Sequence, residues 1–241
     1  MTTIANNISL VHKRIAESAL KAGRLANDVT LVAISKTRSS REVAEAAESG
    51  LIHFGENYLQ ESLRKIAELR DRNLIWHFVG PIQSNKTRQI AENFDWVHSI
   101  DRLKVAQRLN EQRPENLPNL NVCVQLNFNA EDSKAGVLPD EIAALAEKMI
   151  EFERLTFRGI MAIPAPSSDP SIQLETNSAI YRIYADMQRE LPDIDTLSMG
   201  MSADLEAAIS AGSTMLRIGT DIFGQRARQR ATATWENLNH K

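Results

Sequence analysis

The sequence predicts an α/β fold, a single (β/α)₈ barrel of the TIM type, from three observations. Short apolar runs rich in β-branched residues alternate with longer amphipathic runs, which is the pattern of βα units around a parallel sheet. There are eight of these apolar runs, and helical patterns separate them. A length of 241 residues is enough for one such barrel. A doubly wound open sheet uses the same units and remains the alternative, because a strand count does not establish closure.

The elements follow an extra helix at residues 1–25, where polar and apolar residues alternate at helical spacing. The expected strands are residues 30–35, 51–54, 74–79, 96–100, 121–127, 156–163, 196–199 and 215–218. Several of the amphipathic runs between them open with Ser or Asp, which are common N-cap residues. Residues 164–173, "PAPSSDPSIQ", are expected to form the one long loop. We expect one domain over residues 1–241, with residues 225–241 as a C-terminal tail.

The composition excludes several classes of protein. The 28 basic and 31 acidic residues leave a formal charge of −3, which does not indicate a nucleic-acid-binding surface. No run approaches the roughly twenty apolar residues that a membrane helix needs, and the first segment has no signal-peptide pattern. The single cysteine, Cys123, excludes an internal disulfide and a cysteine metal cluster, and it is expected to be a small buried hydrophobe. We expect a cytoplasmic protein without a metal.

The ends of the predicted strands carry the residues with the most distinctive chemistry. In a barrel, the C-terminal ends of the strands line the active site, so residues that follow different strands meet on one face. The residues at these ends are Lys36, Glu56, Asn57, His77, Met161, Gly200, Ser202, Arg217, Gly219 and Thr220. The signatures of nucleotide-binding loops, zinc proteases and α/β-hydrolases are absent from the sequence.

The last two strand ends indicate a phosphate site. "GMSADLEAA" is a turn of small residues that enters a helix at Ser202, and the loops after strands seven and eight commonly bind phosphate in this fold. Gly219 would allow a close backbone approach, and the hydroxyls of Ser202 and Thr220 could donate to phosphate oxygens. Taken singly, Ser202 is better explained as an N-cap and Gly219 as a turn residue. Their joint placement makes a phosphate site an equally good explanation.

Lys36, at the end of "LVAISKT", is a candidate Schiff-base amine. An amine that follows an apolar strand and faces a cation such as Arg217 has its charged form disfavoured, and the neutral amine attacks aldehydes. The alternative is a lysine at a strand end that extends to solvent.

Two other residues have open interpretations. His77 is either a hydrogen-bonded core histidine in an aromatic cluster with Trp76 and Phe78, or a catalytic base. Lys134 is expected to lie in a solvated loop.

Four segments together resemble one protein family. The segments "AISKTRS", "HFGENYLQE", "WHFVGPIQSNK" and "LSMGMSADLEAAISAGSTMLRIGTDIFG" are similar to those of the pyridoxal 5′-phosphate homeostasis proteins, also called proline synthase co-transcribed homologues. The resemblance extends over nearly the whole chain in the family's order and spacing. It implies a barrel of the alanine racemase N-terminal type (fold type III), with pyridoxal 5′-phosphate (PLP) bound covalently to a lysine.

Matching the motif positions implies a role for each site residue. Lys36 corresponds to the Schiff-base lysine, and Arg217 to the residue that faces the pyridine nitrogen. The residues that correspond to phosphate binders are Ser202, Gly219 and Thr220, and those at other pocket positions are Asn57, His77, Met161 and Ser198. Two positions depart from the family's pattern: Arg38, and Asp221, whose carboxylate beside the phosphate could weaken binding.

The resemblance implies a carrier of PLP, without catalysis. A permanently charged guanidinium at Arg217 disfavours a protonated pyridine nitrogen, which limits the ring as an electron sink. Racemases with this barrel use a tyrosine from a second domain, and we expect no such domain here because the chain ends shortly after "RIGTDIFG". The implied role is in PLP (vitamin B6) homeostasis, as a monomer that supplies apo PLP enzymes and so affects amino-acid metabolism. A low-activity PLP-dependent amino-acid racemase and a Schiff-base aldolase without PLP remain alternatives.

Overall fold

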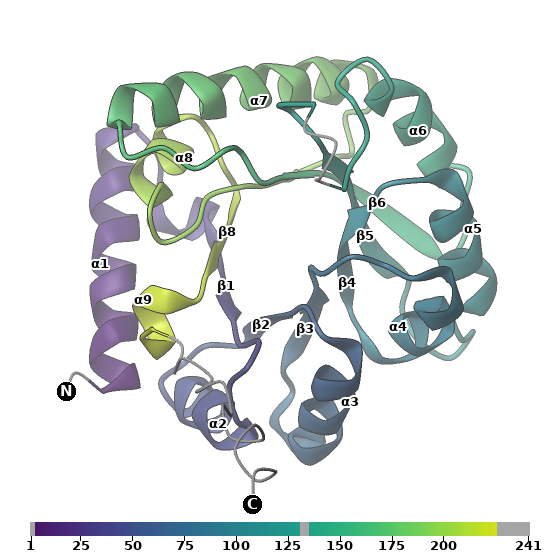
Figure 1. Cartoon of the computed structure of the whole chain (residues 1–241), viewed down its shortest axis with the longest axis horizontal. Helices are drawn as coiled ribbons and strands as arrows, with labels where there is room; N and C mark the ends of the chain where they lie inside the picture. Colours follow the sequence, from purple (N-terminus) through teal and green to yellow (C-terminus); the bar gives the residue numbers. More distant parts are fainter. Residues whose placement is uncertain (1–2, 131–134, 226–241) are drawn as a thin grey trace, which may run out of the picture.

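The computed structural model of the protein describes residues 3–130 and 135–225. Within them, eight parallel strands form a closed barrel in which each strand pairs with the next along the chain (Figure 1). The strands are β1 (Thr30–Ile34), β2 (His53–Glu56), β3 (Ile75–Phe78), β4 (Trp96–Ile100), β5 (Leu120–Leu126), β6 (Leu155–Ala162), β7 (Thr196–Ser198) and β8 (Met215–Ile218). Pairing of β1 with β8, with Val32 opposite Arg217, closes the sheet. The predicted barrel is therefore confirmed, and the open sheet is wrong.

Helices surround the barrel on its outside, as Figure 1 shows. They are α1 (Ile4–Lys21), α2 (Ser40–Glu48), α3 (Leu59–Glu68), α4 (Thr87–Asn93), α5 (Leu103–Gln112), α6 (Ile142–Met149), α7 (Pro170–Glu190), α8 (Leu205–Ser210) and α9 (Thr220–Phe223), with short 3₁₀ turns η1 (Ala26–Asp28), η2 (Arg70–Arg72) and η3 (Ser84–Lys86). In the described part of the chain, no helix is both long and apolar enough to cross a membrane. Lys134 and the C-terminal tail from residue 226 onward lie outside the described residues.

The predicted loop at residues 164–173 is too long at its C-terminal end. Helix α7 begins at Pro170, because the Asp169 carboxylate caps it by accepting a hydrogen bond from Ser171 N at 2.8 Å. Proline is well tolerated in the first turn of a helix, where its missing N–H has no intrahelical partner to lose. The third proline of the segment therefore starts the helix and does not extend the loop.

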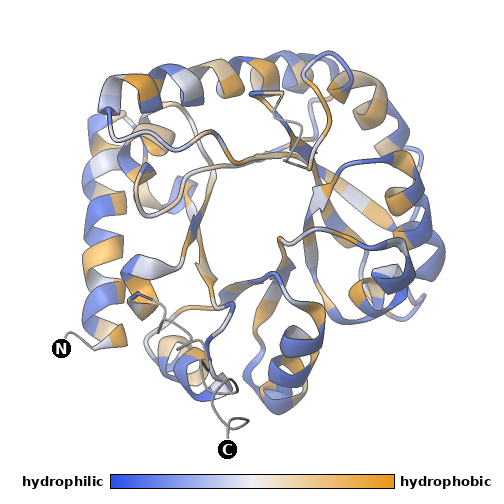
Figure 2. Ribbon diagram, in the orientation of Figure 1, coloured by the Kyte–Doolittle hydropathy of each residue, from blue (hydrophilic) through white to orange (hydrophobic). Residues whose placement is uncertain are grey.

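The apolar side chains form two cores, one outside the barrel and one inside it. Figure 2 shows apolar residues alternating with polar ones around the helices, and the apolar helix faces pack on the outside of the strands. The inner core is smaller and consists of Val32, Trp96, Cys123, Met161 and Met215. Alternate residues of each strand point to opposite faces of the sheet, so neighbouring strand residues contribute to different cores. Burial raises the pKa of the Cys123 thiol to about 12, in agreement with its predicted place in the core.

Helix α1 is the predicted addition to the eight βα units. Thr3 caps it by accepting a hydrogen bond from Asn6 N at 3.3 Å, and the face formed by Ile8, Val11 and Ile15 is buried. Figure 1 shows α1 lying alongside α8 and α9, and it packs against both helices. The first helix of the chain is therefore joined to the elements that follow the last two strands.

Candidate functional site

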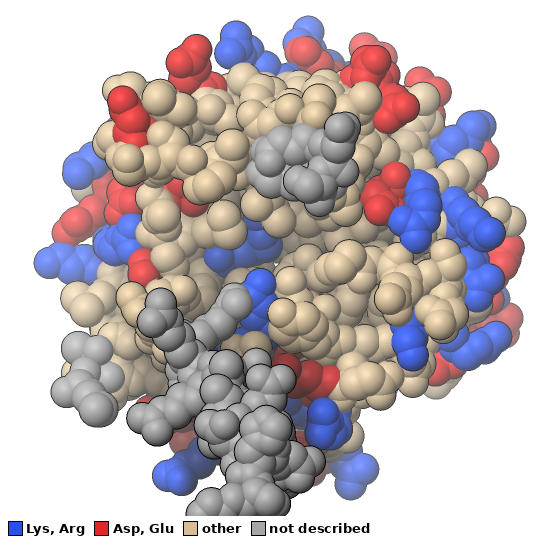
Figure 3. Space-filling view, in the orientation of Figure 1, with Lys and Arg blue, Asp and Glu red and all other residues tan. Residues whose placement is uncertain are grey.

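A cavity of about 280 Å³ opens where the strands end at their carboxyl termini. It is lined by Ile34, Lys36, Arg38, Asn57, Val79, Ile163, Met201, Ser202, Ala203, Arg217, Gly219, Thr220 and Gly224. In Figure 3, charges of both signs are scattered over the outer helices, and basic side chains lie in the hollow at the centre of this face. The structure therefore confirms that the carboxyl ends of the strands converge on one face.

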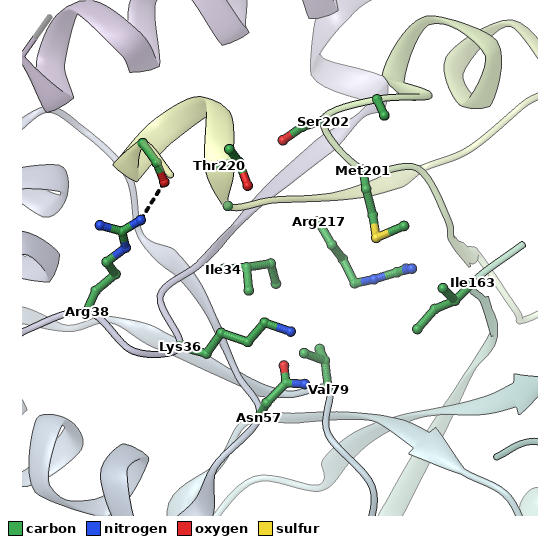
Figure 4. Close-up of a pocket in the computed structure, with 13 residues that line it drawn as sticks. Ile34, Lys36, Arg38, Asn57, Val79, Ile163, Met201, Ser202, Arg217 and Thr220 are labelled. Atoms are coloured by element: carbon green, nitrogen blue, oxygen red, sulfur yellow. Dashed lines mark hydrogen bonds between the residues drawn. The ribbon is translucent and has the colours of Figure 1, made fainter. Parts of the chain in front are cut away.

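Six of the predicted site residues line this cavity: Lys36, Asn57, Ser202, Arg217, Gly219 and Thr220. Figure 4 shows the side chains of Lys36, Asn57 and Arg217 pointing into the cavity, the first two from the loops after β1 and β2 and the third from β8, with the hydroxyls of Ser202 and Thr220 across from Lys36. The other three, which are His77, Met161 and Ser198, are fully buried in the barrel and do not line the cavity.

The backbone around Lys36 is held on both sides. The preceding carbonyl, Ser35 O, accepts a hydrogen bond from Lys65 Nζ at 2.7 Å, and the following amide, Thr37 N, donates to Glu61 Oε1 at 2.6 Å. Lys65 and Glu61 are themselves joined, with 2.5 Å between Nζ and Oε1. Thr37 has a φ of 65°, an uncommon left-handed conformation for a β-branched residue. The α3 residues Glu61 and Lys65 therefore fix the conformation from which the Lys36 side chain projects.

A buried carboxylate, that of Glu56, holds the residue before Lys36. Its Oε1 accepts hydrogen bonds from Ser35 Oγ at 2.6 Å and from Lys65 Nζ at 2.7 Å. Its Oε2 has no hydrogen-bond partner among the described residues. Burial raises the pKa of Glu56, and the charge of Lys65 opposes that shift. Lys65 is thus both the counter-ion of Glu56 and the support of the Lys36 backbone.

Arg217 brings a buried positive charge to the floor of the cavity. Its Nη1 donates to both the carbonyl and the hydroxyl oxygen of Ser198 at 2.7 Å, and its Nη2 donates to Ala162 O at 2.9 Å. Among the described residues, no carboxylate lies within 4.0 Å of this guanidinium. Burial lowers the pKa of Arg217 to about 10, so it stays protonated at neutral pH. A ligand with negative charge or a lone pair would satisfy this cation.

Three histidines continue the hydrogen bonds of Arg217 through the barrel interior. Ser198 Oγ lies 2.9 Å from His98 Nδ1, His98 Nε2 lies 2.9 Å from His77 Nδ1, and His77 Nε2 lies 2.9 Å from His53 Nδ1. Because Arg217 can only donate to Ser198 Oγ, and no second acceptor for this hydroxyl is found among the described residues, Ser198 donates to His98. The network then assigns the proton of His98 and of His77 to Nε2.

Burial keeps these imidazoles neutral. It lowers the pKa of His98 to about 3, helped by the charge of Arg217, and it lowers the pKa of His77 to well below its usual value. His77 also stacks on Trp96, with ring centroids 5.3 Å apart. The interpretation of His77 as a core histidine agrees with this placement. The predicted aromatic cluster of His77 with Trp76 and Phe78 is wrong. The side chains of Trp76 and Phe78 point to the outer face of the sheet and pack there.

The loops after β7 and β8 are joined to each other beside the cavity. Asp221 N donates to Ser202 Oγ at 3.4 Å, which connects the first turn of α9 to the loop before α8. An added Cβ at Gly219 would lie 3.2 Å from Ile34 O, so glycine permits a close approach to β1. Gly200 has a φ of +97°, and an added Cβ would lie 2.5 Å from Ala208 Cβ, so this turn also requires glycine. These glycines bring backbone amides and hydroxyls to one side of the cavity.

Sequence reasoning missed several lining residues, of which Arg38 has the most distinctive chemistry. Its Nη2 donates to Gly224 O at 2.5 Å, and its guanidinium lies over the Phe223 ring, 5.8 Å from the centroid. Its position two residues after Lys36 could have indicated that it lines the cavity, since both residues belong to the loop that follows β1. The apolar lining residues Ile163 and Met201 gave no chemical signal, because only the loop paths place them there.

The chain is similar to known proteins over nearly its whole length. A family model described as the alanine racemase N-terminal domain matches residues 11–227. The pyridoxal phosphate homeostasis protein of Pseudomonas aeruginosa is 54% identical over 226 residues, which cover 94% of this chain and 97% of that protein. The protein of the same name from Escherichia coli is 50% identical over 229 residues, which cover 94% of this chain and 98% of that one.

One similar protein has a solved structure with a bound ligand. The structure of PipY from Synechococcus elongatus with PLP bound is 34% identical to this chain and has a TM-score of 0.75. The match covers 87% of this chain and all of PipY. The high identity over nearly the whole length, the matching family model and the shared barrel all indicate the same family. The chain belongs to the pyridoxal phosphate homeostasis protein family.

Proposed function

We propose that this protein binds PLP covalently and reversibly at Lys36 and serves as a carrier and buffer in intracellular PLP homeostasis. One observation carries the proposal: the cavity brings together an amine, a buried cation and a set of hydroxyl and amide donors. An aldehyde, a pyridine nitrogen and a phosphate are the groups that such a set would complement. The PLP-bound structure of PipY, with 34% identity, supports the proposal.

The residues fit this ligand in size and in polarity. The volume of about 280 Å³ is close to the lower end of ligand pockets, which typically enclose roughly 300–1,000 Å³. Asn57 Oδ1 is buried and has no hydrogen-bond partner among the described residues, so a donor on a ligand would satisfy it. We assign covalent attachment to Lys36, the pyridine nitrogen to Arg217, and the phosphate to Ser202, Gly219 and Thr220.

The buried residues below the cavity have a supporting role in this proposal. Ser198 orients Arg217 directly, and His77 acts only through His98 and Ser198. Met161 fills the inner core beneath them. We therefore assign His77, Met161 and Ser198 to the support of Arg217, and we do not place them in contact with PLP.

The electrostatics of the cavity favour a carrier over a catalyst. When bound, PLP supplies an electron-withdrawing ring, and this ring is most effective when its nitrogen is protonated. The charged guanidinium of Arg217 disfavours that protonation and cannot supply the proton itself. No tyrosine lines the cavity in the part of the chain that the structure describes, and a second acid–base group is what a two-face proton transfer requires. We propose further that the protein is a cytoplasmic monomer that delivers PLP to apo PLP enzymes.

Absorbance of the purified protein tests the proposed attachment. Addition of PLP should produce a band near the violet edge of the visible, and borohydride should abolish the band and fix the mass of PLP on Lys36. Lys36→Ala should lose the band and the tight retention of PLP. Lys104→Ala, at an exposed position of α5, is the matched control and should behave as wild type. A wild-type protein that stays colourless with added PLP would contradict the proposal.

Two further measurements test the carrier role. The loaded protein, incubated with a single enantiomer of alanine, should leave the enantiomer unchanged, and racemisation on an enzyme timescale would contradict a non-catalytic role. The loaded protein should also activate an apo PLP enzyme in the presence of a trap for free PLP. Equal inhibition by the trap, whether PLP is added free or on the carrier, would contradict direct delivery.

A further inference from the structure

Helix α1 reaches both loops of the proposed phosphate site through one side chain, Arg14. Its Nη1 lies 2.5 Å from Asp221 Oδ2, and its Nη2 donates to the backbone oxygen of Ser202 at 3.1 Å. Its Nε and Nη2 also hold the two carboxylate oxygens of Glu206, at 2.7 and 2.9 Å. A single guanidinium therefore ties α1 to the loop after β7, to the start of α8 and to the start of α9.

A second contact fixes α1 against the same elements. Asn7 Nδ2 donates to Ile222 O in α9 at 2.9 Å. Asn7 and Arg14 are seven residues apart, so they lie on the same face of α1 two turns apart. The buried face of Ile8, Val11 and Ile15 lies beside them. The position of Arg14 is therefore set by helix packing and does not depend on its own ion pairs alone.

The charges explain what Arg14 compensates. The backbone amide of Asp221 donates to Ser202 Oγ, so Asp221 lies next to a residue of the proposed phosphate site. A carboxylate there repels a bound phosphate, and Glu206 adds a second negative charge. The pKa of Arg14 is raised above its usual value, chiefly by Glu206 and also by Asp221. Without Arg14, the carboxylates of Asp221 and Glu206 would lose the cation that both of them contact.

We propose that Arg14 is a positioning and charge-compensating residue of the phosphate site, so that binding of PLP depends on a helix that does not line the cavity. The inference rests on the proposed binding of PLP. It gives the extra helix of this barrel a role in ligand binding, and it explains how Asp221 can stand beside a phosphate site. Arg14 acts through Asp221 and Ser202 and makes no contact with the cavity itself.

The test separates the phosphate from the rest of the ligand by comparing PLP with pyridoxal, which has the aldehyde and ring but no phosphate. Arg14→Gln keeps most of the aliphatic stem and removes the charge. It should weaken PLP binding about tenfold, equivalent to roughly 1.4 kcal/mol, and should leave pyridoxal binding unchanged. Inorganic phosphate should compete with PLP correspondingly less well in this variant. An unchanged ratio of PLP to pyridoxal affinity would overturn the proposal.

Removing the carboxylate tests the charge compensation directly. Asp221→Asn alone should bind PLP as tightly as wild type or more tightly, and Arg14→Gln combined with Asp221→Asn should recover to within about threefold of wild type. Arg14→Lys, which keeps the charge, should lose less than Arg14→Gln. A double variant as weak as Arg14→Gln, or equal losses with Lys and Gln, would overturn the compensation.

A matched variant controls for the loss of packing. Arg24 follows α1 and donates to Ile209 O and Ser213 O at 3.1 and 2.8 Å, away from the proposed phosphate site. Arg24→Gln should lower the thermal midpoint of unfolding and leave the PLP to pyridoxal ratio unchanged. An equal change of this ratio in Arg24→Gln and Arg14→Gln would overturn the specific role of Arg14. Failure of the wild type itself to bind PLP would instead overturn the proposed function.

Discussion

Arg217 and Ser198 are joined twice by one nitrogen: Nη1 donates to the carbonyl and to the hydroxyl of Ser198, each at 2.7 Å. The pairing connects the floor of the cavity to the buried chain of Ser198, His98, His77 and His53. Because an arginine only donates hydrogen bonds, it orients the Ser198 hydroxyl and, through it, the imidazoles below. The hydrogen bonds of the buried histidines and the orientation of Arg217, the proposed contact of the pyridine nitrogen, are therefore linked.

Ser198→Ala should destabilise the fold. The change leaves His98 Nδ1 without its partner and removes one acceptor from Arg217, and an unsatisfied buried polar group costs about 1–3 kcal/mol. The free energy of unfolding, measured by urea titration, should fall by that amount. Ser210→Ala, at an exposed position of α8, should leave it unchanged, and equal effects of the two substitutions would contradict the network.

Stability should fall in mild acid because of the buried histidines. The pKa of His98 is about 3 in the folded protein, and that of His77 is well below its usual value of 6.5, so only the unfolded chain takes up their protons below about pH 6.5. Their contribution to stability is present above that pH and is lost as the pH falls toward 3. The expected loss is about 1.4 kcal/mol per pH unit for each histidine.

Urea unfolding at several pH values between about 7.5 and 4.5 measures this loss. Replacement of His98 by Asn should reduce the slope by about one proton. Replacement of the exposed His12 of α1 by Gln should keep the wild-type slope relative to its own stability at neutral pH. A wild-type stability that does not change from pH 7 to pH 5 would show that the imidazoles are protonated or exposed in the folded state.

Lys65→Met should be among the most destabilising substitutions. It leaves the buried carboxylate of Glu56 without its cation and frees the Ser35 carbonyl, and breaking a buried pair typically costs about 3–5 kcal/mol. Covalent attachment of PLP at Lys36 should also become slower, because the Ser35 carbonyl is no longer held and Glu61, which holds Thr37 N, loses its ion pair with Lys65. Lys148→Met breaks an exposed ion pair with Glu151 on the surface and should alter neither property. Similar results for both substitutions would contradict the role of Lys65.

Gly80→Ala should disturb Asn57 in the cavity. An added Cβ would lie 2.3 Å from Asn57 O and 2.9 Å from Asn57 Cα, and these backbone atoms cannot move away as a flexible side chain can. We expect a loss of about 1–3 kcal/mol in stability and a weaker affinity for PLP. Gly23→Ala is the control, because its φ of +68° makes alanine unfavourable although no atom lies nearby. It should lower stability and leave PLP affinity unchanged, and the same outcome for Gly80→Ala would contradict the contact.

Local chemistry accounts for what sequence reasoning predicted well. The sequence predicted that Lys36, Ser202 and Arg217 lie close together, because a parallel barrel places the carboxyl-terminal ends of all its strands on one face. The sequence does not fix the first residue of α7, because Pro170 is typical both of a loop and of a helix start, and only the Asp169 cap distinguishes the two.

The sequence by itself determined the order of the eight βα units and the chemical groups at the ends of their strands, because hydrophobic periodicity and residue type are local properties. Only the tertiary structure decided which side chains share a face or a hydrogen bond across long separations. It placed His77 against Trp96 and not against its neighbours in sequence, and it brought Arg14 to Asp221 from the other end of the chain. These contacts depend on strand register, barrel closure and the packing of α1, which no short stretch of sequence encodes.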